Sequence, residues 1–149
     1  MKNIFIILCF VSAVAYAQTE NTENILNAGH CKVSCMETFK NDSLISAFVT
    51  LDAKDDRSAT LQNYFTICYD TPKNVYKFLG DLEKLANGNS GGSSELSGHK
   101  IDIEKFTGAK DLKVWNEQGL IFHRFLPDQI TTIRTRMKVW ASSHKISLE

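Results

Sequence analysis

The chain has 149 residues and carries 17 basic and 17 acidic side chains, so its formal net charge is zero. This balance excludes a strong overall attraction to nucleic acid or to other polyanions, and we expect no nucleic-acid partner. The length suits one domain with a single hydrophobic core.

The first 17 residues have the three parts of a secretory signal peptide. Lys2 provides a cationic start, residues 4–11 are apolar, and an Ala-Tyr-Ala sequence ends at Ala17 as in an Ala-x-Ala cleavage site. The apolar stretch is shorter than the roughly 20 residues that a spanning helix needs. The sequence therefore predicts cleavage of residues 1–17, export to the periplasm or the extracellular space, and no stable membrane insertion of the mature domain, residues 18–149.

Export would place the cysteines of the mature chain in an oxidising compartment, where disulfides persist. Cys31 and Cys35 would lie about 13 Å apart along one strand, beyond the ~7 Å limit for a bridge. One disulfide would therefore join Cys68 to either Cys31 or Cys35, and we predict the pair Cys35–Cys68. His30 and the two nearby cysteines lack the fourth ligand and the spacing of a zinc site, so we predict no metal and no cofactor.

The first half of the mature chain reads as three strands and a helix. Residues 18–29 are polar and are predicted to be a loose lead-in, after which alternating apolar positions predict strands over 31–39, 44–51 and 62–70. Thr71 then suits an N-cap and Pro72 the first helical position. The helix has one apolar stripe, formed by Val75, Phe78, Leu79, Leu82, Leu85 and Ala86.

The Gly- and Ser-rich residues 87–98 are predicted to be a flexible linker. After it the scheme repeats, with strands predicted over 100–106, 112–115 and 120–125. Pro127 opens a second helix, whose apolar stripe is Ile130, Ile133, Met137, Trp140 and Ala141. The sequence thus predicts an α+β domain made of a tandem βββα pseudo-repeat, with units 31–86 and 99–142. We expect one antiparallel sheet of five or six strands with both helices on one face.

The open face of that sheet is the predicted binding surface. If Leu112, Val114, Leu120 and Phe122 face the helices, their neighbours face outward. The outward set is unusually aromatic, and exposed aromatic patches often bind a partner; its predicted binding residues are Trp115, His123, Phe125 and, from the first unit, Tyr64. Alternatively, the sheet curls or the N-terminal segment covers these side chains.

The sequence contains no nucleophile elbow, no phosphate-binding glycine loop and no His-Glu-x-x-His motif. We therefore expect an exported, non-enzymatic binding or interaction domain whose partner is another protein or a second copy of the chain. One alternative is a thiol-dependent or hydrolytic enzyme in which Cys68 is the nucleophile and His123 the base. Another is a carrier that holds an apolar ligand between sheet and helices.

Overall fold

The computed structural model describes residues 18–28, 30–57, 63–88, 91–106 and 109–149, so the predicted signal peptide lies outside the described residues. Four strands and a helix follow one another, and this order then occurs a second time. The elements are β1 (Gln18–Ala28), β2 (Cys31–Lys40), β3 (Ser43–Lys54), β4 (Tyr64–Asp70), α1 (Pro72–Asn87), β5 (Gly92–Leu96), β6 (His99–Phe106), β7 (Ala109–Trp115), β8 (Phe122–Phe125) and α2 (Pro127–Ser143). Within these ranges, neither helix combines the length and the apolar character needed to cross a membrane.

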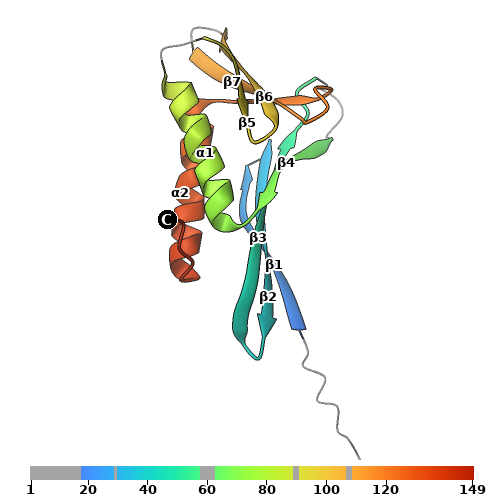
Figure 1. Ribbon diagram of the computed structural model, residues 1–149, viewed down its shortest axis with the longest axis vertical. Helices are drawn as coiled ribbons and strands as arrows, with labels where there is room; N and C mark the ends of the chain where they lie inside the picture. The colour runs from blue at the N-terminus through green and yellow to red at the C-terminus, as the bar shows by residue number, and fades with distance from the viewer. Residues whose placement is uncertain (1–17, 29, 58–62, 89–90, 107–108) are drawn as a thin grey trace, which may run out of the picture.

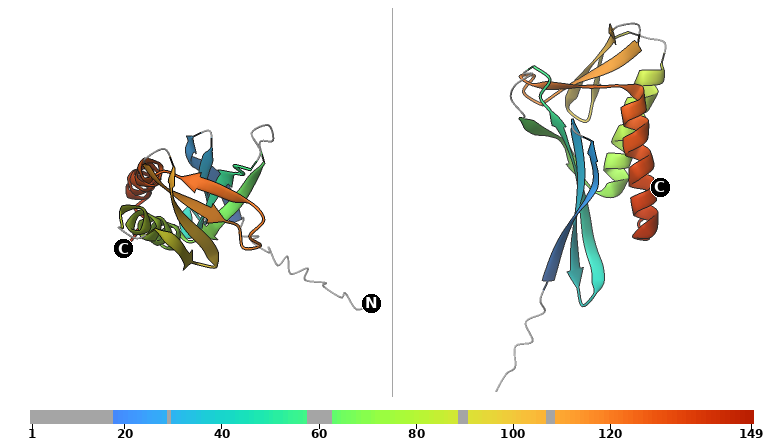
Figure 2. Two further views of the ribbon diagram at one scale, coloured as in Figure 1. Left: turned by 90° about the horizontal axis from the view of Figure 1, so that it is seen from above. Right: turned by 180° about the vertical axis from the view of Figure 1, so that it is seen from behind.

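The strands form two separate antiparallel sheets (Figure 1). Sheet A has the order β1-β2-β3-β4 and sheet B the order β5-β6-β7-β8. The α+β class is confirmed, but the predicted single sheet of five or six strands is wrong, because each half of the chain pairs its strands within itself. Figure 2 shows sheet B crossing over one end of sheet A, with the two helices lying side by side along one side of the molecule.

Each half of the chain has four strands instead of the predicted three, and the additional strand is the first one, β1 or β5. β1 occupies the predicted lead-in and pairs with β2 along its length, from Gln18 opposite Lys40 to Ala28 opposite Cys31. β5 occupies part of the predicted linker and pairs with β6. Both segments are polar or rich in Gly and Ser, so their own strand propensity is low. Pairing with a neighbouring strand of stronger apolar alternation gives them their extended conformation.

Both helices begin where the sequence predicts. The Thr71 hydroxyl accepts a hydrogen bond from the Asn74 backbone N–H at 3.4 Å, and Pro72 follows at the first helical position. At the start of α2, the Gln129 side chain accepts a hydrogen bond from the Leu126 backbone N–H at 2.9 Å. The predicted stripe of α2 is entirely buried, as is that of α1 except for Leu85, which is half-buried.

One continuous core lies between the helices and the two sheets. Its strand residues alternate with exposed or half-buried neighbours, as expected for strands with one covered face. Sheet A contributes Cys31, Val33, Cys35, Val49, Leu51, Ala53 and Ile67, and sheet B contributes Ile101, Leu112, Val114 and Phe125.

Backbone hydrogen bonds connect the two sheets where the chain leaves β3. The Asp56 N–H donates to the Phe122 carbonyl at 3.0 Å, and the Arg124 N–H donates to an oxygen of the Asp56 carboxylate at 2.7 Å. β8 is therefore fixed against the end of β3, and the side chain between these two contacts, His123, lies at the junction of the sheets.

Candidate functional site

Two of the four predicted binding residues lie in the core rather than on an open face. Phe125 is 0 % exposed and His123 is 2 % exposed. The expected orientation is wrong because β8 pairs with β7 so that Phe125 is opposite Leu112 and His123 is opposite Val114. Side chains of directly paired residues share a face, and a shift of one residue exchanges the two faces of a strand. Leu120, predicted to face the helices, is instead 63 % exposed and precedes β8.

Trp115 does lie on the outer face of sheet B, but its neighbours on that face are charged. Its indole N–H donates to the Asp102 carboxylate at 2.7 Å, and its ring centroid is 4.9 Å from that of Phe122. The Lys113 ammonium lies 4.3 Å from the Trp115 ring centroid and 4.2 Å from the Phe122 ring centroid. Arg124 continues the network through ion pairs with Glu104 and Asp111. This face is therefore a polar network rather than an apolar patch.

Tyr64 belongs to the other sheet. It begins β4, and the Lys32 ammonium lies 4.1 Å from its ring centroid. The structure thus places Tyr64 on sheet A, Trp115 on the outer face of sheet B, and His123 and Phe125 in the interior. A binding role for these residues is still only a prediction, and they do not form one surface.

The predicted disulfide between Cys35 and Cys68 is not formed, and Cys31, Cys35 and Cys68 are free thiols. Cys35 lies on β2 and Cys68 on β4, with β3 between them. Neighbouring strands are ~4.8 Å apart, so residues two strands apart are separated by about 10 Å. This is too far for a disulfide between residues whose Cα atoms must approach within about 7 Å.

We therefore expect unreduced protein, unfolded in denaturant, to take up an alkylating reagent at Cys31, Cys35 and Cys68 in every chain. Peptide mass spectrometry reads out the labelled sites, and a sample reduced before alkylation is the control. Recovery of a Cys35–Cys68 linked peptide from the unreduced sample would contradict this arrangement of strands.

The structure pairs His123 with Cys31 instead of Cys68. The Cys31 sulfur lies 3.4 Å from His123 Nε2, across 92 residues of sequence. The other ring nitrogen, Nδ1, lies 2.9 Å from the Lys54 carbonyl oxygen and 3.0 Å from the Asp56 carboxylate. A Cys-His-Asp arrangement thus occupies the junction of the two sheets, built from the first residue of β2, the second residue of β8 and the segment after β3.

The hydrogen-bond partners fix the tautomer of His123. Both neighbours of Nδ1 are acceptors, so Nδ1 carries the proton and donates it. Nε2 then has a lone pair that accepts the Cys31 S–H. Burial lowers the pKa of His123, against the opposing effect of Asp56. Burial, together with Asp56, raises the pKa of Cys31 to about 12. The resting pair is therefore a neutral thiol and a neutral imidazole rather than an ion pair.

Cys31 also borders a small pocket of about 180 Å³. Its other walls are Leu26 on β1 and residues from the first two turns of α2, namely Asp128, Gln129, Thr132 and Ile133. Cys31 thus contacts an imidazole nitrogen through its sulfur and also forms part of a pocket wall. Sequence reasoning missed this combination, since no local motif connects residues 31, 56 and 123.

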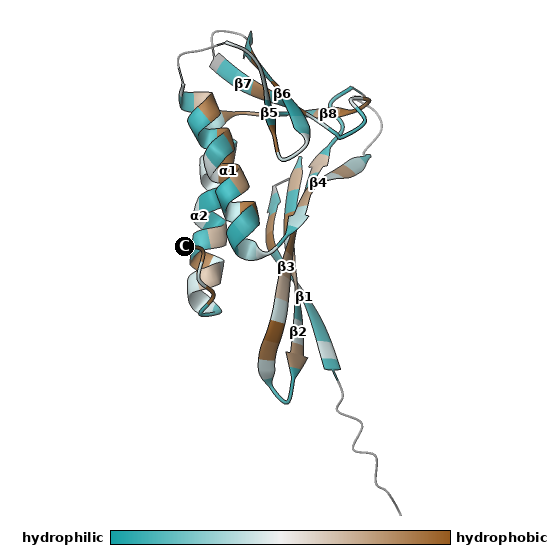
Figure 3. Ribbon diagram, viewed as in Figure 1, coloured by the Kyte–Doolittle hydropathy of each residue, from teal (hydrophilic) through white to brown (hydrophobic). Residues whose placement is uncertain are grey.

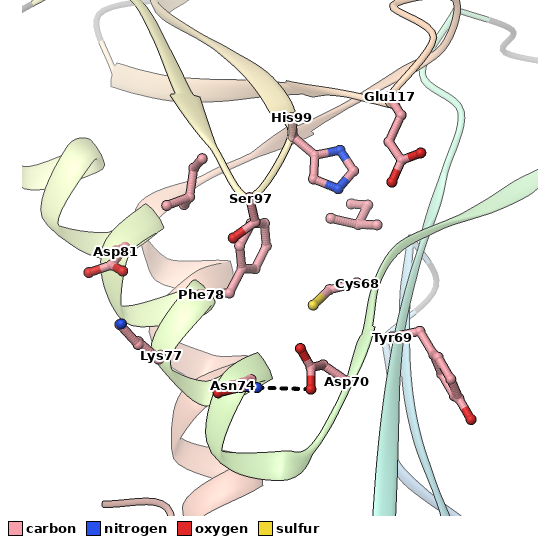
Figure 4. Close-up of a pocket in the computed structure, with 12 residues that line it drawn as sticks. Cys68, Tyr69, Asp70, Asn74, Lys77, Phe78, Asp81, Ser97, His99 and Glu117 are labelled. Atoms are coloured by element: carbon pink, nitrogen blue, oxygen red, sulfur yellow. Dashed lines mark hydrogen bonds between the residues drawn. The ribbon is translucent and has the colours of Figure 1, made fainter.

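Cys68 lines a different pocket, of about 430 Å³, between β4, α1 and the turns after β5 and β7 (Figure 4). Burial raises the pKa of Cys68 to about 11, with a smaller contribution from Asp70. Asp70 accepts hydrogen bonds from the Thr71 N–H and from the Asn74 side-chain amide, so it supports the start of α1. The polar lining of this pocket, which also includes Lys77, Asp81, Ser97, His99 and Glu117, differs from the apolar cavity that a carrier of apolar ligands needs.

The outer parts of β2 and β3 and the turn between them extend beyond the helices (Figure 1). We call residues 38–48 the arm. Figure 3 shows apolar residues concentrated on β3 near its tip. Leu44 is 40 % exposed and Ile45 is 51 % exposed. At the inner end of the arm, the Phe48 ring stacks on Tyr69 of β4, with 5.4 Å between ring centroids, and Tyr69 is itself 54 % exposed.

Comparison with protein-family models gives no match, and neither the curated proteins nor the solved structures include a significant match to this chain. The function must therefore be argued from the geometry of the chain itself.

Proposed function

We propose that this protein is an interaction domain that forms a homodimer by pairing the free edge of β3 in its arm with the same edge of a second copy. The observation that supports this most directly is the length of β3 compared with its partners. β4 pairs with residues 49–54 of β3 only, whereas β2 pairs with β3 almost throughout, from Ser43 to Ala53. Among the described residues, no strand lies against the other edge of residues 43–48.

A free strand edge presents backbone N–H and C=O groups that can pair with another chain. Proteins usually protect such edges with charged side chains, with Pro or with very short strands. Residues 43–51 have no charged residue and no Pro, and six of these nine residues are apolar. The edge therefore lacks protection by charge or by Pro, and its one irregularity is the register shift at Ile45, which has no partner in β2. Burying the edge removes exposed apolar surface at Leu44 and Ile45 from water.

A second copy fits this edge because antiparallel pairing of one segment with itself is symmetric. A two-fold axis through the middle of residues 43–48 places each residue of one copy opposite a residue of the same segment in the other. No like charges meet, since the segment is uncharged. The added strand would continue sheet A where β4 ends, at Asp70 opposite Val49. The predicted signal peptide would place this dimer outside the cytoplasm.

The test replaces one apolar residue on the arm with a charge. We expect the unmodified protein to have the mass of a dimer by light scattering after size exclusion and by native mass spectrometry, and Ile45→Lys to have that of a monomer. Val139→Lys is the matched control, because Val139 is also an exposed apolar residue, 63 % exposed, but belongs to α2 and not to the arm. We expect this control variant to remain a dimer.

Circular dichroism of both variants checks that the fold is retained. The proposal fails if the unmodified protein is monomeric at every concentration tested, or if folded Ile45→Lys has the same dimer mass as the unmodified protein.

A further inference from the structure

Cys31 combines a sulfur within reach of an imidazole nitrogen with a place in the wall of a pocket. The first requirement for activating a thiol is a base within hydrogen-bond reach, and the base in turn needs a group that orients it. His123 Nε2 lies 3.4 Å from the Cys31 sulfur, and Asp56 lies 3.0 Å from Nδ1 on the opposite side of the ring. The tautomer with the proton on Nδ1 is the one in which Nε2 can remove a proton from the thiol.

The base is also held in place by its surroundings. His123 is almost fully buried, and its ring packs edge-on against Phe125 with 4.6 Å between ring centroids. The Arg124 backbone N–H donates to Asp56 at 2.7 Å, which fixes the carboxylate. The imidazole thus has little freedom to turn away from the sulfur.

We propose that Cys31 is an acylation site that accepts a small, uncharged acyl group from an ester or thioester in the pocket beside it. In this step the sulfur bonds to the carbonyl carbon while its proton moves to His123 Nε2. The bond from that carbon to the alcohol or thiol leaving group then breaks, and the leaving group takes the proton from Nε2. The products are S-acylated Cys31 and the free alcohol or thiol, and the imidazole returns to its neutral form.

The pocket determines the class of acyl donor. Its volume of about 180 Å³ admits only a small molecule. Leu26 and Ile133 give it apolar walls, and the Asp128 carboxylate at its edge disfavours anionic donors. The thiol itself is neutral at rest, so the site depends on proton transfer to His123 during the reaction and not on a preformed thiolate.

The experiment uses p-nitrophenyl acetate, a small uncharged ester, with native protein near neutral pH. Release of p-nitrophenolate gives the rate, and peptide mass spectrometry identifies the acylated cysteine. Cys35 and Cys68 are internal controls: Cys35 is as buried as Cys31, and Cys68 is the more exposed thiol. We expect acetylation of Cys31 first, whereas reactivity that follows exposure alone would favour Cys68.

Two sets of variants separate a general base from simple accessibility. His123→Gln is expected to slow acetylation of Cys31 by about 100-fold, the lower end of the contribution of a general base, and Asp56→Asn is expected to slow it by a smaller factor. Cys68→Ser is expected to leave the rate unchanged. Acetylation of Cys68 before Cys31 in the native protein, which requires no variant to fold, overturns the proposal. The proposal is also overturned if both folded variants, His123→Gln and Asp56→Asn, acetylate Cys31 at the rate of the unmodified protein.

Discussion

Replacing Phe125 with Ala is expected to lower the free energy of unfolding by about 3–5 kcal/mol, the usual cost of truncating a buried aromatic residue. Phe125 has no exposed surface, and it lies directly opposite Leu112 on the covered face of sheet B. Its removal leaves a cavity between β7, β8 and the helices that the surrounding strands cannot fill without breaking their pairing. Urea unfolding followed by circular dichroism measures the change.

Trp115→Ala is the matched comparison, because Trp115 is a large aromatic residue at the end of the neighbouring strand. Trp115 is half-buried on the outer face of sheet B. Its replacement removes one hydrogen bond to Asp102 and the ring contacts with Phe122 and Lys113. We expect a clearly smaller loss of stability than for Phe125→Ala. A larger loss in the free energy of unfolding for Trp115→Ala than for Phe125→Ala would mean that Trp115, and not Phe125, faces the core.

The two helices could be predicted from the sequence because cap residues and apolar stripes are local features. Thr71 and Pro72 mark the start of α1, and the apolar stripes of both helices become buried. β1 could not be found in this way, because only Ile25 and Leu26 within its 11 residues suggest a covered strand. Its conformation comes from pairing with β2, which is a tertiary effect that a single segment does not reveal.

The errors at the predicted site have a related cause. β8 is only four residues long, from Phe122 to Phe125, so alternation alone does not define its inner face. The register of β8 with β7 determines which face is covered, and it places His123 inside the protein. The sequence predicts Cys68 as the cysteine beside His123, whereas in the structure it is Cys31. The contact between them depends on how the two sheets meet, and no spacing in the sequence encodes that.

Stability is expected to fall as the pH is lowered below about 6.5, and part of this loss should come from His123. The pKa of an unperturbed histidine is about 6.5, and burial lowers the pKa of His123 in the folded protein. Above pH 6.5 the residue is neutral in both states and contributes no pH dependence. Below it, the unfolded chain binds a proton that the folded chain does not, so the free energy of unfolding decreases by at most about 1.4 kcal/mol per pH unit for this group.

The carboxylates act in a lower pH range, which allows the two effects to be separated. The pKa values of Asp55, Asp70, Glu83 and Asp102 are lowered in the folded protein, so their contributions are lost only as the pH falls below about 4.5, the range in which unfolded carboxylates become protonated. Urea unfolding of the unmodified protein and of His123→Gln at several pH values between about 4.5 and 7.5 isolates the histidine, because only the difference between the two slopes belongs to His123. Equal slopes for His123→Gln and the unmodified protein would mean that His123 gains its proton as readily in the folded state as in the unfolded chain.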